Sequence, residues 1–169
     1  KAENLNTFKG EYLLIKISIL LSFIFCFTML AKSEFDYIFI REALRFNLSF
    51  KLLKAIAITE SGLNPKAINN NSNGTSDYGL MQINSIHLRR FKDITKEDLF
   101  NPSINIYIGA EVLKKCVNRH GLNYKALNCY NGRVKNNPYS NKVIANLLKI
   151  NRGIDYEIIA TPNSSIFTK

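Results

Sequence analysis

The feature that most constrains the fold of this chain is a mostly apolar helix that ends in a carboxylic acid. Residues 50–61 are apolar at most positions until Glu60, with Ser49 placed to cap the start of the helix and Gly62 placed to end it. An Asn-rich segment with the turn dipeptide Asn73-Gly74 follows, which predicts a small β-hairpin. A helix with so little polar surface must lie deep in a core. The rest of the chain is therefore expected to pack around it.

Helical periodicity dominates the remainder of the chain. Further amphipathic helices are expected over residues 34–47, 101–120, 123–131 and 139–149, each bounded by capping residues or turn formers. The length fits one domain with a real hydrophobic core. Residues 153–169 show no periodicity and are expected to form a tail or a crossing segment. The predicted fold class is α+β, mainly α, with a helical core and one hairpin.

The most apolar run lies near the start, at residues 12–31. Its uninterrupted part, residues 17–31, is short for a membrane span and about right for the core of a signal peptide. Small residues at Ala31 and Ser33 predict cleavage after Ser33, and an uncleaved anchor is the alternative. Both interpretations place the rest of the chain in the periplasm or cell envelope. The expected organisation is an N-terminal segment at 1–33, a domain at 34–152 and a tail at 153–169.

The chain carries a formal net charge of +10. No block of Lys and Arg with interleaved aromatics is present, so nucleic acid is not an expected partner. The charge favours attraction to the acidic cell envelope, with a solvated basic surface as the alternative. Contact with a membrane is expected only through the N-terminal segment, if that segment is not cleaved.

Cysteines and histidines indicate little chemistry. Cys26 falls in the predicted signal peptide, and Cys116 and Cys129 lie on two successive predicted helices. A disulfide between them is possible after export, but two small buried thiols are the favoured interpretation. Neither His87 nor His120 shows the spacing of metal ligands, so neither a metal nor an organic cofactor is implied.

Two carboxylates are candidates for acid–base chemistry. Glu60 follows Ile56 and Ala57 by one helical turn, so it faces the same way as the buried stripe, and burial is expected to raise its pKa. Such an acid can give a proton to a glycosidic oxygen. Asp77 follows the hairpin, which can fold it back across a cleft from Glu60. The alternatives are a Glu60 that reaches solvent and an Asp77 that only binds the local backbone.

Three short motifs occur in order along the chain: Glu60-Ser61, Gly79-Leu80-Met81-Gln82 and Tyr130-Asn131-Gly132. Together they resemble the signatures of the soluble lytic transglycosylases, a family with the lysozyme-like fold, and most closely its small members that accompany secretion and conjugation machines. The resemblance covers residues 35–150. The order of acid, hairpin, Asp77 and Tyr78-Gly79 is also similar to that of animal-type lysozymes.

The resemblance implies a role for each matching residue. Glu60 would be the single acid and base, with Ser61 orienting it or the sugar. Met81 and Gln82 would line the glycan cleft, with core packing as the alternative for Met81. Tyr130 would form a hydrogen bond near Glu60, and Asn131 would support it.

The implied activity is cleavage of the MurNAc-β-1,4-GlcNAc bond of peptidoglycan with formation of 1,6-anhydro-MurNAc. The implied partners are peptidoglycan glycan strands and components of a secretion, conjugation or pilus apparatus. Two alternatives stay open on the sequence alone. One is a hydrolytic lysozyme in which Asp77 acts with Glu60, and the other is a non-catalytic assembly factor that binds glycan.

Overall fold

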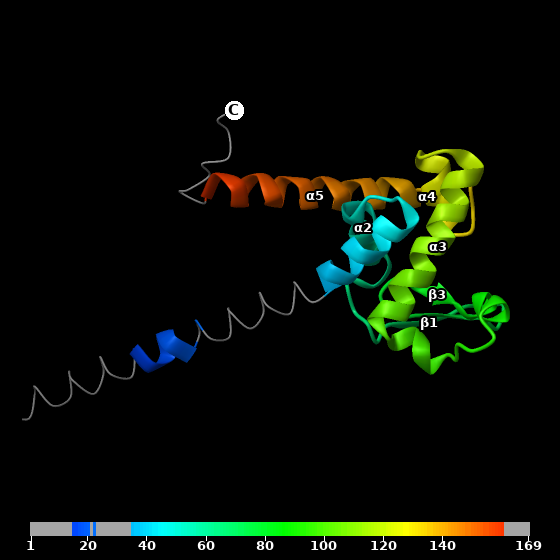
Figure 1. The fold of residues 1–169 in the computed structure, drawn as a ribbon, viewed down its shortest axis with the longest axis horizontal. Helices are drawn as coiled ribbons and strands as arrows, with labels where there is room; N and C mark the ends of the chain where they lie inside the picture. Colours follow the sequence, from blue (N-terminus) through cyan, green and yellow to red (C-terminus); the bar gives the residue numbers. More distant parts are fainter. Residues whose placement is uncertain (1–14, 21, 23–34, 161–169) are drawn as a thin grey trace, which may run out of the picture. The chain divides into compact units, whose positions relative to one another are not determined.

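A computed structural model of the chain describes residues 15–20, 22 and 35–160, with the backbone alone for residues 153–160. Its internal contacts divide the chain into two units, Lys1–Tyr37 and Ile38–Lys169, and the fold below is that of the second unit (Figure 1). The predicted cleavage position after Ser33 lies outside the described residues. Within the described part of the chain, no helix has both the length and the hydropathy to cross a membrane.

The second unit is mainly helical with one small sheet, which confirms the predicted fold class. Its elements follow the end of a helix at 35–46 in this order: α2 (Phe50–Ser61), β1 (Ile68–Asn70), β2 (Ser76–Tyr78), β3 (Ile83–Asn84), η1 (Ser85–Arg90), η2 (Glu97–Phe100), α3 (Pro102–His120), α4 (Tyr124–Tyr130) and α5 (Tyr139–Ala160).

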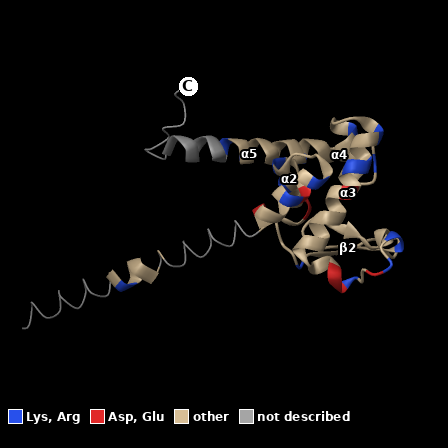
Figure 2. Ribbon diagram, in the orientation of Figure 1, with Lys and Arg blue, Asp and Glu red and all other residues tan. Residues whose placement is uncertain are grey.

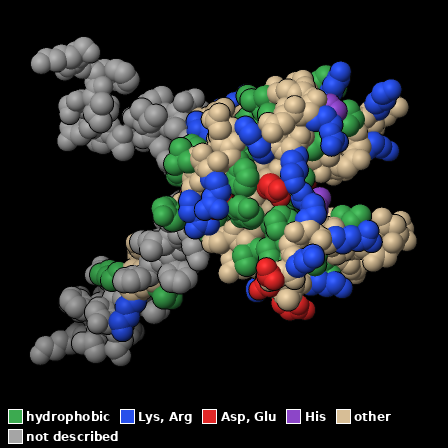
Figure 3. Space-filling view, turned by 45° about the vertical axis from the view of Figure 1, so that its right-hand side comes forward, with side chains coloured by type: hydrophobic (Ala, Val, Ile, Leu, Met, Phe, Trp, Pro, Cys, Tyr) green, Lys and Arg blue, Asp and Glu red, His purple; other side chains and the backbone are tan. Residues whose placement is uncertain are grey.

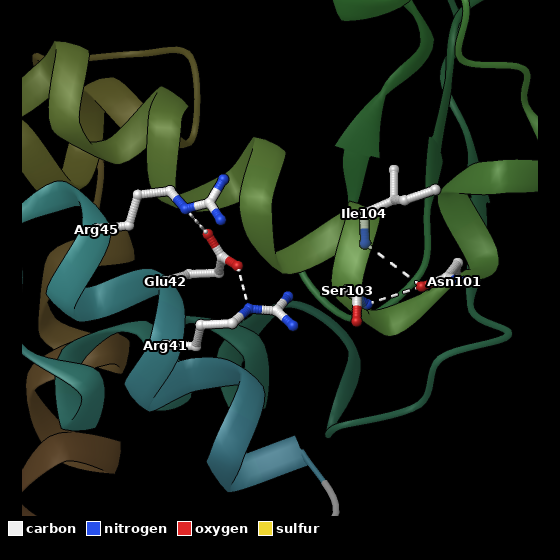
Figure 4. A network of polar contacts seen from close by, with 6 residues as sticks. All are labelled: Arg41, Glu42, Arg45, Asn101, Ser103 and Ile104. Carbon is white, nitrogen blue, oxygen red and sulfur yellow. Dashed lines mark hydrogen bonds and ion pairs between the residues drawn. The ribbon is translucent and has the colours of Figure 1, made fainter.

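The predicted caps fix the helix ends. Ser49 Oγ accepts a hydrogen bond from Leu52 N at the start of α2, and Gly62 ends that helix in the left-handed conformation at φ 64°. The Asn101 side chain accepts hydrogen bonds from the first free N–H groups of α3, as Figure 4 shows, and Asn123 does the same for α4. Local hydrogen bonds of these capping residues therefore set the helix ends, and the residue types can be recognised in the sequence.

The sheet has three antiparallel strands in the order β1-β2-β3, so the expected hairpin gains a third strand. The register places Asp77 of β2 opposite Asn69 of β1 on one side and Asn84 of β3 on the other. Residues opposite one another across a ladder have side chains on the same face of the sheet. Asp77 and two amide side chains therefore form one row across the sheet.

Two predictions about the helices were wrong. Cys116 on α3 and Cys129 on α4 form a disulfide with their Cα atoms 5.8 Å apart, where two free thiols were favoured. The packing of α3 against α4 brings the pair within bridging distance, which sequence spacing alone does not reveal. The last helix was expected to end at Lys149, yet α5 continues to Ala160. One glycine inside a helix costs only about 1 kcal/mol relative to alanine, so Gly153 does not end it.

The core lies between the helices and the segment that joins β2 to β3. Its largest fully buried apolar side chains come from α2 and α3, from the β2–β3 connection, from the helix at 35–46, from η2 and from α5: Leu53, Ile56, Ile106, Ile108, Leu113, Leu80, Met81, Phe39, Leu99 and Val143. α2 contributes a run of buried residues between Leu52 and Ala57, as its composition predicts. The carboxyl end of α2 lies beside the β2–β3 connection, where Ser61 Oγ donates to the Leu80 carbonyl.

The helix at 35–46 holds a buried ionic cluster, and one arginine of that cluster also contacts α3. The Glu42 side chain is 1% exposed, and Arg41 Nε and Arg45 Nε lie 2.6 and 3.2 Å from its carboxylate oxygens (Figure 4). The Arg45 guanidinium also lies 5.4 Å from the centre of the Tyr107 ring on α3. A buried carboxylate needs charged partners of this kind, because alone it would lose its hydration without compensation.

Candidate active site

Glu60 lies half-buried in the last turn of α2. Burial raises the pKa of its carboxyl from 4.5 to about 7. Tyr139 Oη donates a hydrogen bond to Glu60 Oε1 at 2.6 Å, which lowers the pKa by less than burial raises it, and the negative charge of Asp77 raises it further. A carboxyl with this pKa is protonated in a large fraction of molecules at neutral pH. It can therefore act as a general acid and, after losing its proton, as a base.

Two stacked tyrosines stand beside this carboxyl. The rings of Tyr130 and Tyr139 lie with their centres 6.4 Å apart and their planes 18° from parallel. Burial raises the pKa of both phenols, and the charge of Glu60 raises it further. Both hydroxyls therefore stay protonated and serve as donors. Tyr130 Oη donates to the Met81 carbonyl at 2.8 Å, so the hydroxyl that reaches Glu60 belongs to Tyr139.

Asp77 is held in place by amide side chains. Its Oδ1 accepts from Asn84 Nδ2 at 2.7 Å, and its Oδ2 accepts from Asn71 Nδ2 at 3.0 Å and Asn69 Nδ2 at 3.4 Å. These amides fix the carboxylate on the face of the sheet that the strand register provides. Both oxygens already accept hydrogen bonds, which suits a fixed negative charge better than an attacking nucleophile.

Side chains from three helices bind the main chain of residues 78–82. Ser61 Oγ at the end of α2 donates to the Leu80 carbonyl at 2.8 Å, and Tyr130 at the end of α4 binds the Met81 carbonyl. Asn105 of α3, 1% exposed, accepts from Met81 N and donates to the Tyr78 and Leu99 carbonyls, each at 2.7 Å. This segment thus links the helix that carries Glu60 to the strand that carries Asp77.

The backbone at Gly79 packs closely against Leu99 and Asn105, which leaves no room for a side chain. Its φ is +73°, and a Cβ there would lie 2.5 Å from the Leu99 carbonyl oxygen and overlap the Asn105 amide. Only glycine fits both the backbone conformation and the space. This geometry explains why the Gly-Leu-Met-Gln motif begins with glycine.

The other predicted binding residues act on the scaffold of the site. Met81 is 0% exposed, so its side chain packs in the core, which was the alternative for it, and does not line a cleft. Gln82 is half-buried at φ 46°, and its Nε2 donates to the Gly79 and Ala67 carbonyls. Ser61, as described, binds the Leu80 carbonyl rather than the Glu60 carboxylate. The Ser61 and Gln82 side chains thus stabilise the turn between β2 and β3.

Asn131 takes part in the hydrogen bonds of the turn that precedes α5. Its Oδ1 accepts from Asn137 Nδ2 at 3.0 Å, and Asn137 Oδ1 accepts from Tyr139 N at 3.0 Å. Asn128 Oδ1 accepts from Ser140 N at 2.9 Å. Asn131 was expected to support Tyr130, and in the structure it supports the turn that places Tyr139.

Sequence reasoning missed Tyr139 and Asn105. Tyr139 is separated from Glu60 by 79 residues, and no local pattern announces that contact. Its position directly after Pro138, at the start of a predicted helix, was the one available signal. Asn105 interrupts the apolar stripe of α3, and a buried polar residue in such a stripe is a sign of a structural hydrogen bond.

No metal centre is built into the described residues: among them, no three His, Cys, Asp or Glu side chains come together in a way that can hold a metal ion.

A family model described as "Transglycosylase SLT domain" matches residues 37–143. The chain belongs to this family. The match is more than half of the chain, and it contains Glu60, Asp77, the 78–82 segment and Tyr139.

Several curated proteins are similar to about half of this chain. "Invasion protein IagB" of Salmonella typhi is 40% identical over 89 residues, which cover 51% of this chain and 56% of that protein. "Protein IpgF" of Shigella flexneri is 37% identical over 90 residues, covering 52% and 59%. A "Peptidoglycan-binding-like protein" of Escherichia coli O157:H7 is 40% identical over 96 residues, covering 51% and 58%. The matched segment thus spans somewhat more than half the length of these curated relatives.

A solved structure supports the fold. It is that of an inactive mutant of the lytic transglycosylase Slt from Pseudomonas aeruginosa, and it matches with a TM-score of 0.59 and 21% sequence identity. The match covers 73% of this chain and 25% of that one. The SLT family domain of this chain therefore has the fold found in that part of the larger enzyme.

Proposed function

We propose that the chain is a peptidoglycan lytic transglycosylase that cleaves the MurNAc-β-1,4-GlcNAc bond, with Glu60 as its single acid and base. The observation that carries the proposal is the Glu60 carboxyl with its pKa near 7, positioned in a chain of the SLT family. The inactive mutant of the Pseudomonas enzyme has a glutamate replaced by glutamine. That change supports a glutamate as the essential acid in this family fold.

In the first step, the proton of Glu60 passes to the glycosidic oxygen. Because Tyr139 Oη donates to Oε1, the proton available for transfer sits on Oε2. Protonation allows the bond between C1 of MurNAc and the bridging oxygen to break. The N-acetyl oxygen of the same sugar then bonds to C1 and takes up the positive charge, and the GlcNAc end leaves as an alcohol.

In the second step, Glu60 acts as the base. Its carboxylate accepts the proton of the 6-hydroxyl of the same MurNAc, whose oxygen attacks C1 and displaces the N-acetyl oxygen. The products are 1,6-anhydro-MurNAc and a regenerated Glu60 acid, and no water is consumed. The attack is intramolecular, so it benefits from a high effective molarity when water is kept from the site.

Asp77 has a supporting part in this mechanism. Its negative charge raises the pKa of Glu60 and can stabilise the positive charge that develops at C1. The hydrogen bonds from Asn69, Asn71 and Asn84 hold the carboxylate in one orientation. We favour the transglycosylase over the hydrolytic alternative, in which Asp77 would attack or shield C1 and a water would then complete the reaction.

We further propose that the chain acts in the periplasm or cell envelope, where it opens the wall locally for a secretion, conjugation or pilus apparatus. The name "Invasion protein" of the Salmonella relative and the "Peptidoglycan-binding-like" name of the Escherichia coli relative support this setting. Peptidoglycan glycan strands are the proposed substrate.

The test is mass analysis of the muropeptides that the purified chain releases from isolated peptidoglycan. The proposal expects products one water lighter than hydrolysis products, ending in 1,6-anhydro-MurNAc. Glu60→Gln should lower the rate by at least about 10³-fold, since general acid–base catalysis contributes on this scale. Glu97→Gln, the same change on an exposed residue of η2, is the matched control.

Two results would contradict the proposal. Products with ordinary reducing ends would show hydrolysis and make Asp77 a direct participant. Binding of peptidoglycan without cleavage by the wild-type chain would favour the non-catalytic alternative.

A further inference from the structure

A cluster of charged side chains lies on η1 and α3, outside the residues assigned to the chemistry. Glu111 is at its centre: Lys115 Nζ lies 2.7 Å from its Oε1 and Arg90 Nη2 lies 3.5 Å from its Oε2. Arg90 Nη2 is also 3.4 Å from His87 Nδ1. The Arg90 guanidinium lies 5.3 Å from the centre of the Phe91 ring, which limits its orientations. Side chains from two elements thus hold two cations around one carboxylate.

The cluster adjoins the candidate active site through Asn84. The Nδ2 of this residue donates to Asp77 Oδ1 at 2.7 Å, and its Oδ1 accepts from Ile86 N at 3.0 Å, where it caps η1. One side chain therefore connects the Asp77 carboxylate to the element that carries His87 and Arg90. Consistent with this, the charge of Asp77 acts on both Glu60 and His87.

Arg90 and Lys115 are exposed enough to bind a further ligand. The Arg90 and Lys115 side chains are 39% and 52% exposed, whereas Glu111 is 23% exposed. Two positive groups share one negative group, so the cluster is net positive with His87 neutral. Figure 2 shows Lys and Arg on α3 and in the segment that follows the sheet, and Figure 3 shows Lys and Arg side chains next to acidic and His side chains on one face of the molecule.

We propose that Arg90 and Lys115 form a subsite that binds the carboxylates of the peptide stems on peptidoglycan, so that the chain selects stem-bearing glycan over bare glycan. This inference rests on the proposed function. Glycan stripped by an amidase keeps one lactyl carboxylate on each MurNAc, whereas an attached stem converts that group to an amide and carries several free carboxylates farther from the sugar. An exposed guanidinium presents parallel N–H donors that match a carboxylate, and a nearby ammonium adds charge.

The first measurement is binding that does not depend on cleavage. The full chain with Glu60→Gln is sedimented with intact peptidoglycan and with glycan from which an amidase has removed the stems. We expect about fivefold to tenfold tighter binding to intact material at low salt, a preference that shrinks at high ionic strength because exposed charges are screened. Equal binding to both materials would overturn the proposal.

Variants then locate the preference. Arg90→Gln and Lys115→Gln in the Glu60→Gln background should each reduce the ratio of binding to intact and stripped glycan about threefold or more. Lys149→Gln removes the same charge from an exposed position on α5, ten residues and about 15 Å along the helix from Tyr139, and should keep the ratio. A loss that is equal on both materials, or equal for Lys149→Gln, would assign the effect to stability or net charge and overturn the subsite.

The outcomes separate this inference from the proposed function. If the wild-type chain does not cleave either material, the transglycosylase proposal fails, yet the binding ratio still tests the subsite. If cleavage yields anhydro products while the ratio is unity, the activity stands and the subsite is wrong.

Discussion

The raised pKa of Glu60 has a consequence for folding that is independent of activity. A carboxyl whose folded pKa exceeds its unfolded value destabilises the fold once it must ionise, so the cost is absent below the unfolded value of 4.5 and complete above about 7. At about 1.4 kcal/mol for each pH unit, this interval corresponds to about 3 kcal/mol. Glu60→Gln keeps the shape and the acceptor for Tyr139 but removes the charge. The variant should therefore be more stable than wild type at pH 8.5, by up to about 3 kcal/mol.

The assay is urea unfolding of the wild-type chain and of Glu60→Gln, followed by circular dichroism from pH 4 to pH 8.5. With an m-value of about 1.5 kcal/mol/M, the midpoints should differ by about 2 M at pH 8.5 and coincide near pH 4. Every other titrating group is common to both proteins and cancels in the difference. Glu97→Gln, on an exposed side chain, should show no such divergence with pH.

The reasoning fails if the difference between the two proteins is the same at both ends of the pH range. It also fails if Glu60→Gln is the less stable protein at pH 8.5. In the first case burial would not be the cause of the perturbed acid, and in the second the ionised carboxylate would be stabilising the fold.

Three other predictions concern groups around the site. Tyr139→Phe removes the hydrogen bond that lowers the pKa of the site glutamate, so the alkaline limb of the pH–rate profile should move up by about one pH unit. Replacing Cys116 and Cys129 together by Ser should lower the free energy of unfolding by about 3 kcal/mol, and a reductant should mimic this only in the wild-type chain. Gly79→Ala should destabilise by more than about 2 kcal/mol in thermal unfolding, because a Cβ there meets a carbonyl oxygen at 2.5 Å. Gly74→Ala, with a similar φ but nothing within 4 Å, should cost only about 1 kcal/mol.

The parts of the fold that the sequence predicts well are those with local causes. Ser49, Gly62, Asn101 and Asn123 each bind backbone groups of their own helix, so their residue types state where the helix ends lie. The position of Glu60 near the buried stripe follows from helical spacing in the same way.

The contacts that sequence reasoning missed or did not favour depend on how the helices pack against one another. The Cys116–Cys129 bridge depends on how α3 packs on α4, and the contact of Tyr139 with Glu60 depends on how α5 packs on α2. Met81 shows a subtler difficulty. Its place in a motif near the site suggested a side chain that faces the glycan, whereas its carbonyl is what meets Tyr130.

The hydrogen bonds to the main chain of Met81 give a physical reason why the three sequence motifs occur together. Ser61, Asn105 and Tyr130 come from three helices, and each uses its side chain to bind the main chain of residues 78–82. A short, tightly bent segment can satisfy only some of its own carbonyl and N–H groups, and leaving the others buried and unpaired would cost more than most single contacts provide. The motif residues supply those partners, and in doing so they lock α2 to the strand that carries Asp77. The separation of the two carboxylates, on which the pKa of Glu60 partly depends, is therefore set by hydrogen bonds to backbone rather than by any contact between the carboxylates themselves.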